Sequence, residues 1–379
     1  MIYLLKQIDA SVIVSHYHKN FFLNYPVDLL LVGLLLYDSC KNHYKLQNIS
    51  EYMKAKFIQV LIYCFCTPIL SQMTPVQMQQ KMGIGINLGN TLDAPMEGMW
   101  APRAQEQLFV QFKQKNFSCV RIPIRWDQHM LDEPPYTVNK TFIQRIHEVV
   151  DWSLSRDLVT IINTHHDTWF EKEFPDSLPR FKALWKQIAT EFASKSELLL
   201  FEIYNEPHIF TAKDLNQMNS EILPIIRRLN PTRIVIFGGL EWMNPRWIFN
   251  NPDTILFPPD DTHIMLEIHN YDPWGYAGGN NPTIHDWDST NDLSTLNNWM
   301  HHISIWSKAK NVPIFYGEFG CTKEQGKGRY DWYAQHAADI KHYGFAAAVW
   351  ADHHKFAMLN RTTFVWDTEI LSALGNEPI

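Results

Sequence analysis

The sequence predicts an α/β protein, an eight-stranded parallel (β/α)8 TIM barrel, over residues 72–379. Three observations lead to this fold. Eight short apolar runs of strand length recur along the region, amphipathic helical patterns separate most of them, and polar or aromatic residues follow the runs. In such a barrel the C-terminal ends of the strands meet at one rim, where active sites lie. We therefore expect the residues that follow the runs to form one site.

The eight runs alternate with helical patterns in the manner of βα units. They cover residues 83–88, 119–124, 159–165, 198–205, 233–237, 263–269, 312–318 and 345–350. Two of the intervening segments have clear apolar helical stripes, at positions 181, 184, 185, 188 and 192 and at 296, 299, 300, 303 and 306. The fifth crossover is the weakest, because residues 242–255 hold only a short helix. A doubly wound open sheet is the alternative, but no glycine-rich phosphate loop follows the first run.

Two of the runs end in a glutamate. One leads into Asn205-Glu206-Pro207, and another ends at Glu318 before Phe319 and a glycine. Pro207 has no amide hydrogen and biases the preceding residue toward extended geometry, so we expect Glu206 to stand extended at the tip of its strand. A single glutamate is most often a solvated surface charge. Two that close separate apolar strands favour a functional pair.

Composition places the chain among ordinary globular proteins. It has 46% apolar residues, a net charge of −7 and no basic excess that would indicate nucleic-acid binding. Its 14 Trp, 15 Tyr and 22 Phe are a heavy aromatic load, part of which can form flat platforms on which sugars stack. Cys119 and Cys321 are expected at opposite ends of the barrel, too far apart for a disulfide. The sequence has no CxxC pair or HExxH motif that would indicate zinc.

The sequence of the N-terminal region predicts that the protein is exported from the cell. Residues 53–71 contain two lysines, a mostly apolar stretch of fourteen residues and a small residue, which is the layout of a signal peptide, and residues 1–52 are expected to be an upstream extension. The alternative is a membrane anchor, but a spanning helix needs about 20 apolar residues. We therefore expect a secreted, extracellular protein whose catalytic domain is residues 72–379. The sequons at Asn116, Asn139 and Asn360 are glycosylation acceptors if the host is eukaryotic.

Six ordered sequence blocks at the ends of the runs resemble those of glycoside hydrolase family 5, the cellulase family A endo-β-1,4-glucanases. The blocks are residues 87–94, 120–124, 161–167, 205–207, 268–272 and 316–320. The resemblance extends from about Thr74 to the C-terminus. It implies a (β/α)8 glycosidase that acts with retention of configuration.

The resemblance also implies which side chains act on the glycosidic bond. A retaining glycosidase needs two carboxyl groups about 5 to 5.5 Å apart, and the match makes Glu206 the general acid/base and Glu318 the nucleophile. Arg121 and Tyr271 match the family residues that stabilise the nucleophile as an anion. His269 matches the histidine beside the acid/base. An apolar rim and a nearby anion are expected to favour the protonated form of Glu206.

The remaining matches imply contacts to the sugar. Asn205 matches the residue that hydrogen-bonds the sugar 2-hydroxyl, and Asn87 is counted with the substrate-binding residues. His165 matches a histidine that lines the same subsite, while His166 matches a narrower subset of sequences. Trp350 matches the tryptophan that forms the floor beneath the attacked sugar.

Other residues near these blocks admit two interpretations. Trp126, Trp169 and Trp274 either extend the aromatic platform or pack in the core. His165 and His166, followed by an aspartate, suggest a metal cluster, but adjacent residues on a strand point to opposite faces and would not reach one ion. Two departures from the family pattern, Ile86 and the segment 350–354, indicate that the outer sugar subsites differ.

These observations predict a retaining endo-β-1,4-glucanase that cleaves cellulose or mixed-linkage β-glucan without a cofactor or metal. Its partner is the β-glucan polysaccharide, with no nucleic acid and no stable membrane association, and we expect a monomer. A β-mannanase or xyloglucanase of the same family is the nearest alternative, since the same pair serves a different groove. A carbohydrate-binding barrel without activity and a metal-dependent amidohydrolase-like barrel are the alternatives from other classes.

Overall fold

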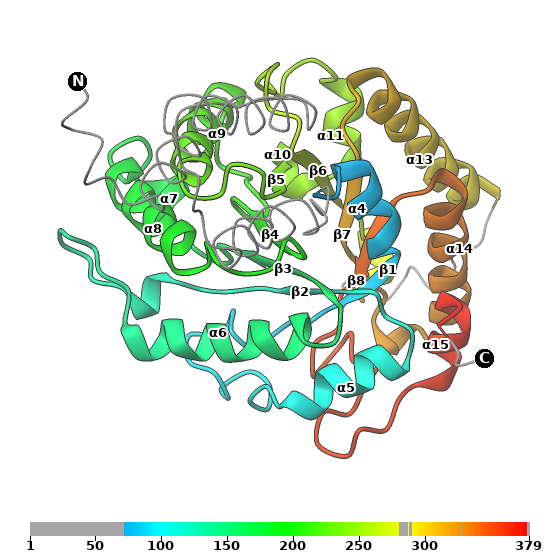
Figure 1. Ribbon diagram of the computed structural model, residues 1–379. Helices are drawn as coiled ribbons and strands as arrows, with labels where there is room; N and C mark the ends of the chain where they lie inside the picture. The colour runs from blue at the N-terminus through cyan, green and yellow to red at the C-terminus, as the bar shows by residue number, and fades with distance from the viewer. Residues whose placement is uncertain (1–71, 280–286, 288–289, 327, 377–379) are drawn as a thin grey trace, which may run out of the picture. The chain divides into compact units, whose positions relative to one another are not determined.

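Eight parallel strands close into a barrel in the computed structural model, each paired with its neighbours in sequence and the last paired with the first (Figure 1). The structure describes residues 72–376 except 280–286, 288–289 and 327. The strands are β1 (Ile84–Asn87), β2 (Cys119–Ile122), β3 (Val159–Asn163), β4 (Leu199–Glu202), β5 (Val235–Gly238), β6 (Ile264–His269), β7 (Ile314–Phe319) and β8 (Ala346–Val349). Each lies within one of the eight predicted runs or overlaps it, so the barrel fold is confirmed.

Helices surround the strands, as a parallel barrel requires. They are α4 (Pro75–Met82), α5 (Glu106–Gln114), α6 (Lys140–Leu154), α7 (Trp169–Lys172), α8 (Leu178–Glu191), α9 (Ala212–Arg227), α10 (Leu240–Met243), α11 (Pro245–Asn250), α12 (Trp274–Ala277), α13 (Thr290–Lys310), α14 (Gly328–Tyr343) and α15 (Thr368–Leu374), with short 3₁₀ turns η1 (Asp127–His129) and η2 (Lys323–Gln325). Both predicted apolar stripes lie on helices, α8 and α13, except that position 192 is the residue that follows α8. The fifth crossover holds only α10 and α11, as its sequence predicts.

Side-chain caps begin several of these helices. Thr74 and Thr211 each form a capping box with the third residue of the following helix, and Asn139 accepts the backbone N–H groups of Thr141 and Phe142. Such caps satisfy amide groups that have no partner within the helix. The predicted sequon Asn139 therefore uses its side-chain oxygen to begin α6.

The barrel interior has an apolar lower layer and a polar upper layer. Residues two apart on a strand point the same way, so Cys119 and Arg121 on β2, and Met265 and Glu267 on β6, share the interior. Met78 and Met82 of α4 join the lower apolar cluster at the N-terminal end of the barrel. The larger apolar cluster lies between strands and helices. The polar residues are thus left to the C-terminal rim.

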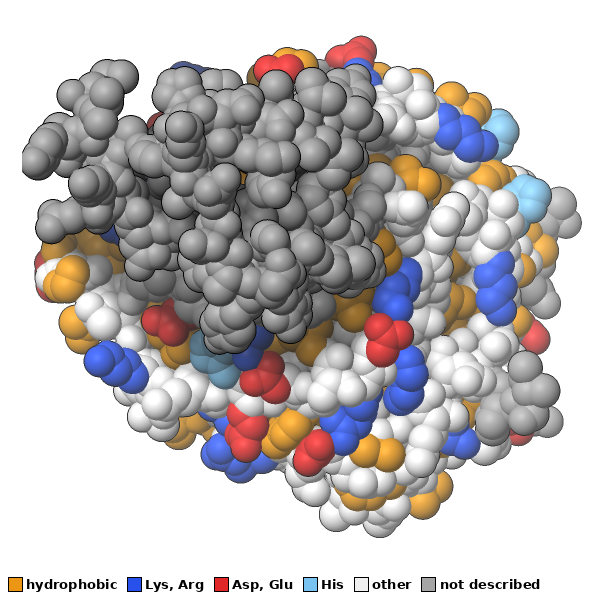
Figure 2. Space-filling model, viewed as in Figure 1, with side chains coloured by type: hydrophobic (Ala, Val, Ile, Leu, Met, Phe, Trp, Pro, Cys, Tyr) orange, Lys and Arg blue, Asp and Glu red, His pale blue; other side chains and the backbone are white. Residues whose placement is uncertain are grey.

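Both cysteines that the structure describes are free and buried, which confirms that Cys119 and Cys321 do not form a disulfide. Cys119 opens β2, and Cys321 follows β7. Among the described helices, none has the length and apolar character needed to cross a membrane. Where described residues are visible in Figure 2, lysine and arginine side chains are interspersed with aspartate and glutamate.

Residues Gln72–Ile379 form one compact unit. The predicted extension at 1–52 and the predicted signal peptide at 53–71 lie outside the described residues, so the structure does not bear on either.

Candidate active site

Glu206 and Glu318 both lie at the C-terminal rim of the barrel, as predicted. Glu318 is part of β7, where the pairing of β7 with β6 and with β8 shifts register. Glu206 lies four residues after β4 ends and has φ 50°. The expectation that Pro207 holds Glu206 extended is therefore wrong. Positive φ is costly for a residue with a side chain and is often found where function fixes the backbone.

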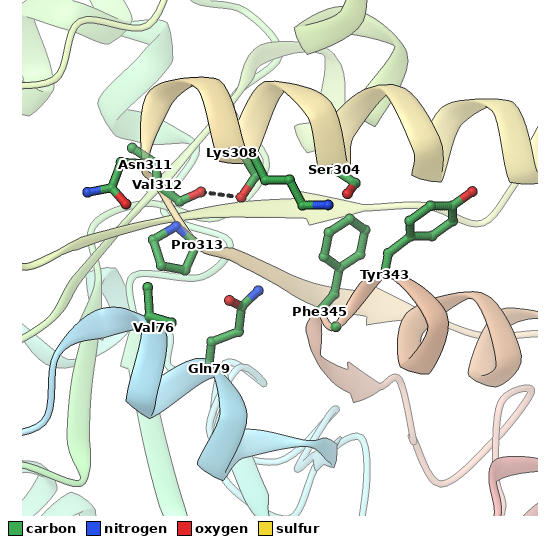
Figure 3. Close-up of a pocket in the computed structure, with 11 residues that line it drawn as sticks. Val76, Gln79, Ser304, Lys308, Asn311, Val312, Pro313, Tyr343 and Phe345 are labelled. Atoms are coloured by element: carbon green, nitrogen blue, oxygen red, sulfur yellow. Dashed lines mark hydrogen bonds between the residues drawn. The ribbon is translucent and has the colours of Figure 1, made fainter.

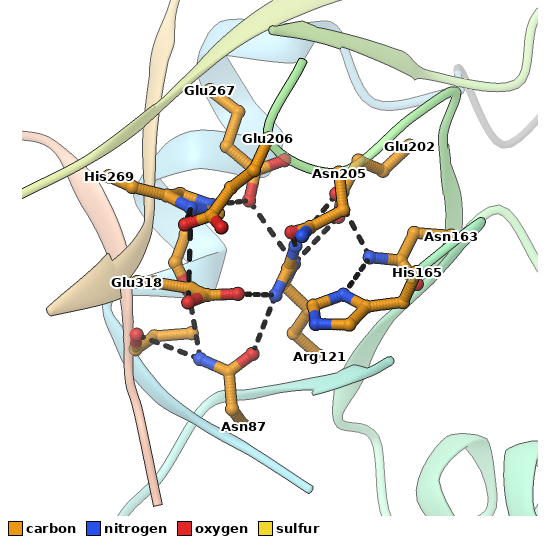
Figure 4. Close-up of polar contacts among 12 residues, drawn as sticks. Asn87, Arg121, Asn163, His165, Glu202, Asn205, Glu206, Glu267, His269 and Glu318 are labelled. Carbon is orange, nitrogen blue, oxygen red and sulfur yellow. Dashed lines mark hydrogen bonds and ion pairs between the residues drawn. The ribbon is translucent and has the colours of Figure 1, made fainter. Parts of the chain in front are cut away.

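His269, the last residue of β6, lies between the two carboxylates (Figure 4). Its Nδ1 is 2.9 Å from Oε1 of Glu206 and 3.8 Å from Oε2 of Glu318. The three side chains each offer one atom within 4.8 Å of the others. The two predicted catalytic carboxylates therefore face each other across a gap of a few ångströms, and the predicted place of His269 beside Glu206 is confirmed.

Glu318 is held at both of its oxygens. Arg121 donates from Nη1 to Oε1 over 2.6 Å, and the Tyr271 hydroxyl donates to Oε2 over 2.8 Å. Burial raises the pKa of Glu318 above its ordinary value, although the positive charges of His269 and Arg121 act in the opposite direction. Burial and the charge of Glu318 also raise the pKa of Tyr271, so its phenol remains a donor. The geometry predicted for Arg121 and Tyr271 is confirmed.

Arg121 has no exposed surface and is paired with more than one carboxylate. Its Nε and Nη2 donate to the two oxygens of Glu202 over 2.6 and 2.7 Å, and Nε is 3.1 Å from Glu267. These contacts hold the pKa of Arg121 well above its ordinary value, although burial alone lowers it. Glu202 and Glu267 were missed by the sequence analysis. Their signal is positional, since each is an inward-facing acid near the end of an otherwise apolar strand.

Asn87 does not reach a sugar. It is fully buried, its Nδ2 donates to the Gly317 and Ala348 carbonyls, and its Oδ1 accepts from Arg121. The predicted substrate contact of Asn87 is therefore wrong, because every polar atom of its side chain is used beneath the site. Arg121 also lies beneath the site, where it contacts Glu318.

Asn205 and His165 present hydrogen-bond donors to the rim. Oδ1 of Asn205 accepts from Arg121 over 2.7 Å, which leaves its Nδ2 group to donate. The Asn163 amide is fixed because its Oδ1 accepts the Ile124 N–H, and its Nδ2 lies 3.1 Å from Nδ1 of His165. Nδ1 of His165 must therefore accept, and its proton sits on Nε2. Burial and nearby positive charge lower the pKa of His165 well below its ordinary value, so the ring stays neutral.

His166 does not continue the strand. It follows the end of β3 with φ 58°, and its ring lies edge-on to His165 with centroids 4.5 Å apart. The expectation that the two rings point to opposite faces is wrong. Asp93, His165 and His166 each offer one atom within 4.8 Å of the others. The donor set nevertheless fits a metal poorly, because Nδ1 of His165 is already occupied and Nε2 carries the proton.

Comparison with known proteins identifies the family. A family profile described as Cellulase (glycosyl hydrolase family 5) matches residues 82–355. The chain belongs to glycosyl hydrolase family 5. It is 42% identical over 310 residues to Endoglucanase H of Acetivibrio thermocellus, covering 80% of this chain and 34% of that protein. It is 28% identical to Cellulase/esterase CelE of the same organism, covering 82% of this chain and 42% of that protein.

Solved structures of family 5 enzymes superimpose along the whole barrel. Endoglucanase Cel5A from Thermotoga maritima matches with TM-score 0.76 and 30% identity, covering 80% of this chain and 100% of that one. The same enzyme in complex with mannotriose matches with TM-score 0.75, covering 79% of this chain. By contrast, this chain spans between about a third and half of the two curated relatives named above. The predicted family and fold are confirmed.

The aromatic residues of this family 5 site differ in their exposure. Trp350 is half-buried and lies parallel to His165, with ring centroids 5.9 Å apart and planes 6° apart. Trp274 is 50% exposed and packs edge-on against Tyr271. Trp126 is 1% exposed, so the interpretation of Trp126 as part of a platform is wrong. Trp169 is half-buried beneath the guanidinium of Arg180, which is a packing role.

The two departures from the family pattern have different consequences. Ile86 lies in the apolar cluster between strands and helices, so it does not face the sugar site. Asp352 is buried, and its Oδ1 accepts the backbone N–H groups of His354 and Phe356. His354 in turn lies with Nε2 2.7 Å from the Trp100 carbonyl, which ties the loop after β8 to the loop after β1. This second departure therefore lies at the rim.

A separate cavity of about 190 Å³ lies at the opposite end of the barrel (Figure 3). Val76 and Gln79 of α4 line it, together with residues that precede β7 and β8, such as Pro313 and Phe345. No predicted site residue lines it. It is therefore distinct from the rim that carries Glu206 and Glu318.

Proposed function

We propose that this chain is a retaining endo-β-1,4-glucanase that cleaves internal bonds of cellulose or mixed-linkage β-glucan. The observation that carries the proposal is the approach of the Glu206 and Glu318 carboxylates around His269, with one atom from each side chain within 4.8 Å. Retaining glycosidases place their carboxyl groups about 5 to 5.5 Å apart, whereas inverting enzymes leave about 6.5 to 9.5 Å for a water molecule. The short gap supports attack by Glu318 itself.

The proposed reaction has two halves. In the first, an oxygen of Glu318 bonds to the anomeric carbon while the glycosidic bond breaks, and Glu206 gives its proton to the departing oxygen. In the second, Glu206 takes a proton from water, the water oxygen bonds to the anomeric carbon, and the ester to Glu318 breaks. Two inversions leave the configuration unchanged.

The neighbouring side chains support both halves. Asn205 and His165 offer Nδ2 and Nε2 donors toward the sugar, and Tyr271 and Arg121 hold the carboxylate of Glu318. Trp350 offers a flat face at the same rim. Groups fixed before the substrate arrives stabilise the charge that develops in the transition state.

The names of the relatives agree with this assignment, since the similar proteins include Endoglucanase H and endoglucanase Cel5A. Cel5A has also been solved with mannotriose. A β-mannanase is therefore the second candidate. Comparing hydrolysis of barley glucan, carboxymethylcellulose, xyloglucan and mannan distinguishes the two, because a mannanase would be fastest on mannan.

The test of the mechanism is replacement of either carboxylate by its amide. General acid/base catalysis contributes about 10²–10⁴-fold, so we expect Glu206→Gln and Glu318→Gln to lose at least that much turnover on soluble cellulose. Glu221→Gln is the matched control, because Glu221 forms only a surface ion pair with Lys182. NMR of the first product should show the β anomer. Parent-level activity in either site variant, or an α product, would overturn the proposal.

We also propose that the protein is secreted and acts as a monomer. Support for secretion is the sequence of residues 53–71, with its lysines, apolar stretch and small residue. N-terminal sequencing of the protein from culture medium is the test, and a product that retains residues before Met53 would contradict it. Gel filtration tests whether the protein is a monomer in solution.

A further inference from the structure

A third carboxylate, Glu267, contacts the ring nitrogen of His269 that does not face Glu206 (Figure 4). It is two residues before His269 on β6, so both side chains point into the barrel. Glu267 has no exposed surface and therefore does not touch the sugar. The role of Glu267 is therefore inferred from its contacts with other side chains.

The site is built around the Glu267 carboxylate. Its Oε1 is 3.0 Å from Nε2 of His269 and 3.1 Å from Nε of Arg121. A Cβ atom at Gly317, the residue before Glu318, would lie 1.6 Å from that same oxygen. Glycine at this position leaves the room that the carboxylate fills. Glu267 and the strand that carries Glu318 are thus fitted to each other.

His269 bridges two acids. Its Nδ1 lies 2.9 Å from Oε1 of Glu206, and its Nε2 lies 3.0 Å from Oε1 of Glu267. With Oε1 of each acid accepting, both ring nitrogens donate, which is the imidazolium form of His269. Burial alone lowers the pKa of His269, but the charge of Glu318 and the hydrogen bonds to Glu206 and Glu267 raise it to about 10.

We propose that Glu267 is the positioning residue for the acid/base step. By accepting from Nε2–H of His269, it keeps Nδ1–H directed at Oε1 of Glu206. Oε2 of Glu206 is then the oxygen that gives the proton to the departing sugar oxygen and later takes one from water. His269 holds both of its protons throughout, so no proton is lost or gained beneath the site. This inference rests on the proposed function.

The charged groups around Glu267 come from four strands. Arg121 lies on β2, Glu202 on β4, His269 on β6 and Glu318 on β7, while β1, β3, β5 and β8 carry no titratable side chain. Burial and the charge of Glu202 raise the pKa of Glu267 to about 7, although Arg121 and His269 act to lower it. A negative Glu267 in turn favours the imidazolium. Removing that charge makes His269 neutral at lower pH, which moves the alkaline limb of activity downward.

The test is Glu267→Gln in the whole chain, which keeps an acceptor for Nε2–H but removes the charge. A nearby opposite charge shifts a pKa by about 1–3 units, so we expect the alkaline limb to fall by that amount. We also expect kcat/KM on phenyl β-cellobioside, whose leaving group needs a proton, to fall about 10-fold or more. On 2,4-dinitrophenyl β-cellobioside, whose leaving group needs none, kcat/KM should remain near the parent value.

Two further variants separate positioning from packing. Glu267→Asp retains the charge and should keep the alkaline limb near the parent position. Asp261→Asn is the matched control, because Asp261 is paired with Arg227 before β6 begins, at the other end of that strand from His269. It should leave the pH profile and the ratio of the two substrates unchanged.

Different results would refute the role of Glu267 and the proposed function on which that role rests. Equal losses on both cellobiosides with an unshifted pH profile, or no loss at all, would overturn the positioning role of Glu267. If Glu267→Gln does not fold, as judged by circular dichroism, Glu267→Asp decides by its alkaline limb. A parent chain that hydrolyses neither cellobioside nor soluble glucan would instead refute the proposed function.

Discussion

Replacing Tyr271 with Phe removes one hydrogen bond from the proposed nucleophile and leaves the ring in place. The hydroxyl donates to Oε2 of Glu318 over 2.8 Å, at a side chain that is only 6% exposed. This hydrogen bond favours the ionised carboxylate, so its loss raises the pKa of Glu318 further above its ordinary value. Glu318 attacks only when ionised.

The size of the effect follows from the environment of the bond. A hydrogen bond to a charged group contributes about 1.5–3 kcal/mol, and one pKa unit corresponds to about 1.4 kcal/mol. We therefore expect the pKa of Glu318 to rise by about 1–2 units in Tyr271→Phe. The acidic limb of kcat/KM should move to higher pH by the same amount.

The assay is kcat/KM on 2,4-dinitrophenyl β-cellobioside across the pH range in which the parent is active. Its reactive leaving group makes the rate report the nucleophile rather than the acid. Tyr330→Phe is the matched control, because the Tyr330 hydroxyl donates to Asp367 over 3.4 Å outside the site. An acidic limb that stays in place in Tyr271→Phe, or moves as far in Tyr330→Phe, would refute the reasoning.

Four further substitutions test other parts of the structure. Asn163→Ala removes the donor to Nδ1 of His165, so the ring proton is no longer confined to Nε2 and KM should rise about 10-fold, with nitrogen chemical shifts reporting the tautomer. Burial lowers the pKa of His336 to about 3, so it contributes stability above its unfolded pKa of about 6.5 that is lost as pH falls toward 3. Urea unfolding of His336→Gln should lose about 1.4 kcal/mol less per pH unit than the parent in that window. Trp274→Ala, at a half-exposed ring, should raise KM for polysaccharide several-fold with little loss of melting temperature, whereas Trp126→Ala, at a buried ring, should cost about 3–5 kcal/mol in unfolding free energy.

The strands were predictable because each is an apolar run that ends where polar residues begin. Glu202 and Glu267 were not predicted, because each lies within such an apolar run. A charged residue within an apolar run can be interpreted only when the inward face of the strand is known, and that face is set by the closed barrel. Once Arg121 and His269 are known to point inward, two more acids can be recognised as inward-facing. They are Glu267, two residues before His269, and Glu202, three residues before Asn205. The sequence alone does not show which face of each strand points inward.

The backbone at Glu206 was not predictable from neighbouring residues. Pro207 favours an extended residue before it, yet Glu206 has φ 50°. The loop that follows is held by Glu171, whose Oε1 accepts the backbone N–H groups of His208, Ile209 and Phe210. Glu171 is 37 residues from the nearest of these in the chain. Tertiary contacts of this kind override a local preference.

The buried acids explain how Arg121 stays in place when Glu318 loses its charge. In the proposed reaction Glu318 becomes a neutral ester, and an arginine paired with it alone would then be a buried, unpaired cation, which is costly. Arg121 retains both bonds to Glu202 and its contact with Glu267 at that stage. Its Nη1 donor is therefore already positioned when the carboxylate returns in the second half. A donor fixed in advance lowers the barrier without reorganisation, and the buried carboxylates of Glu202 and Glu267 keep this donor in place.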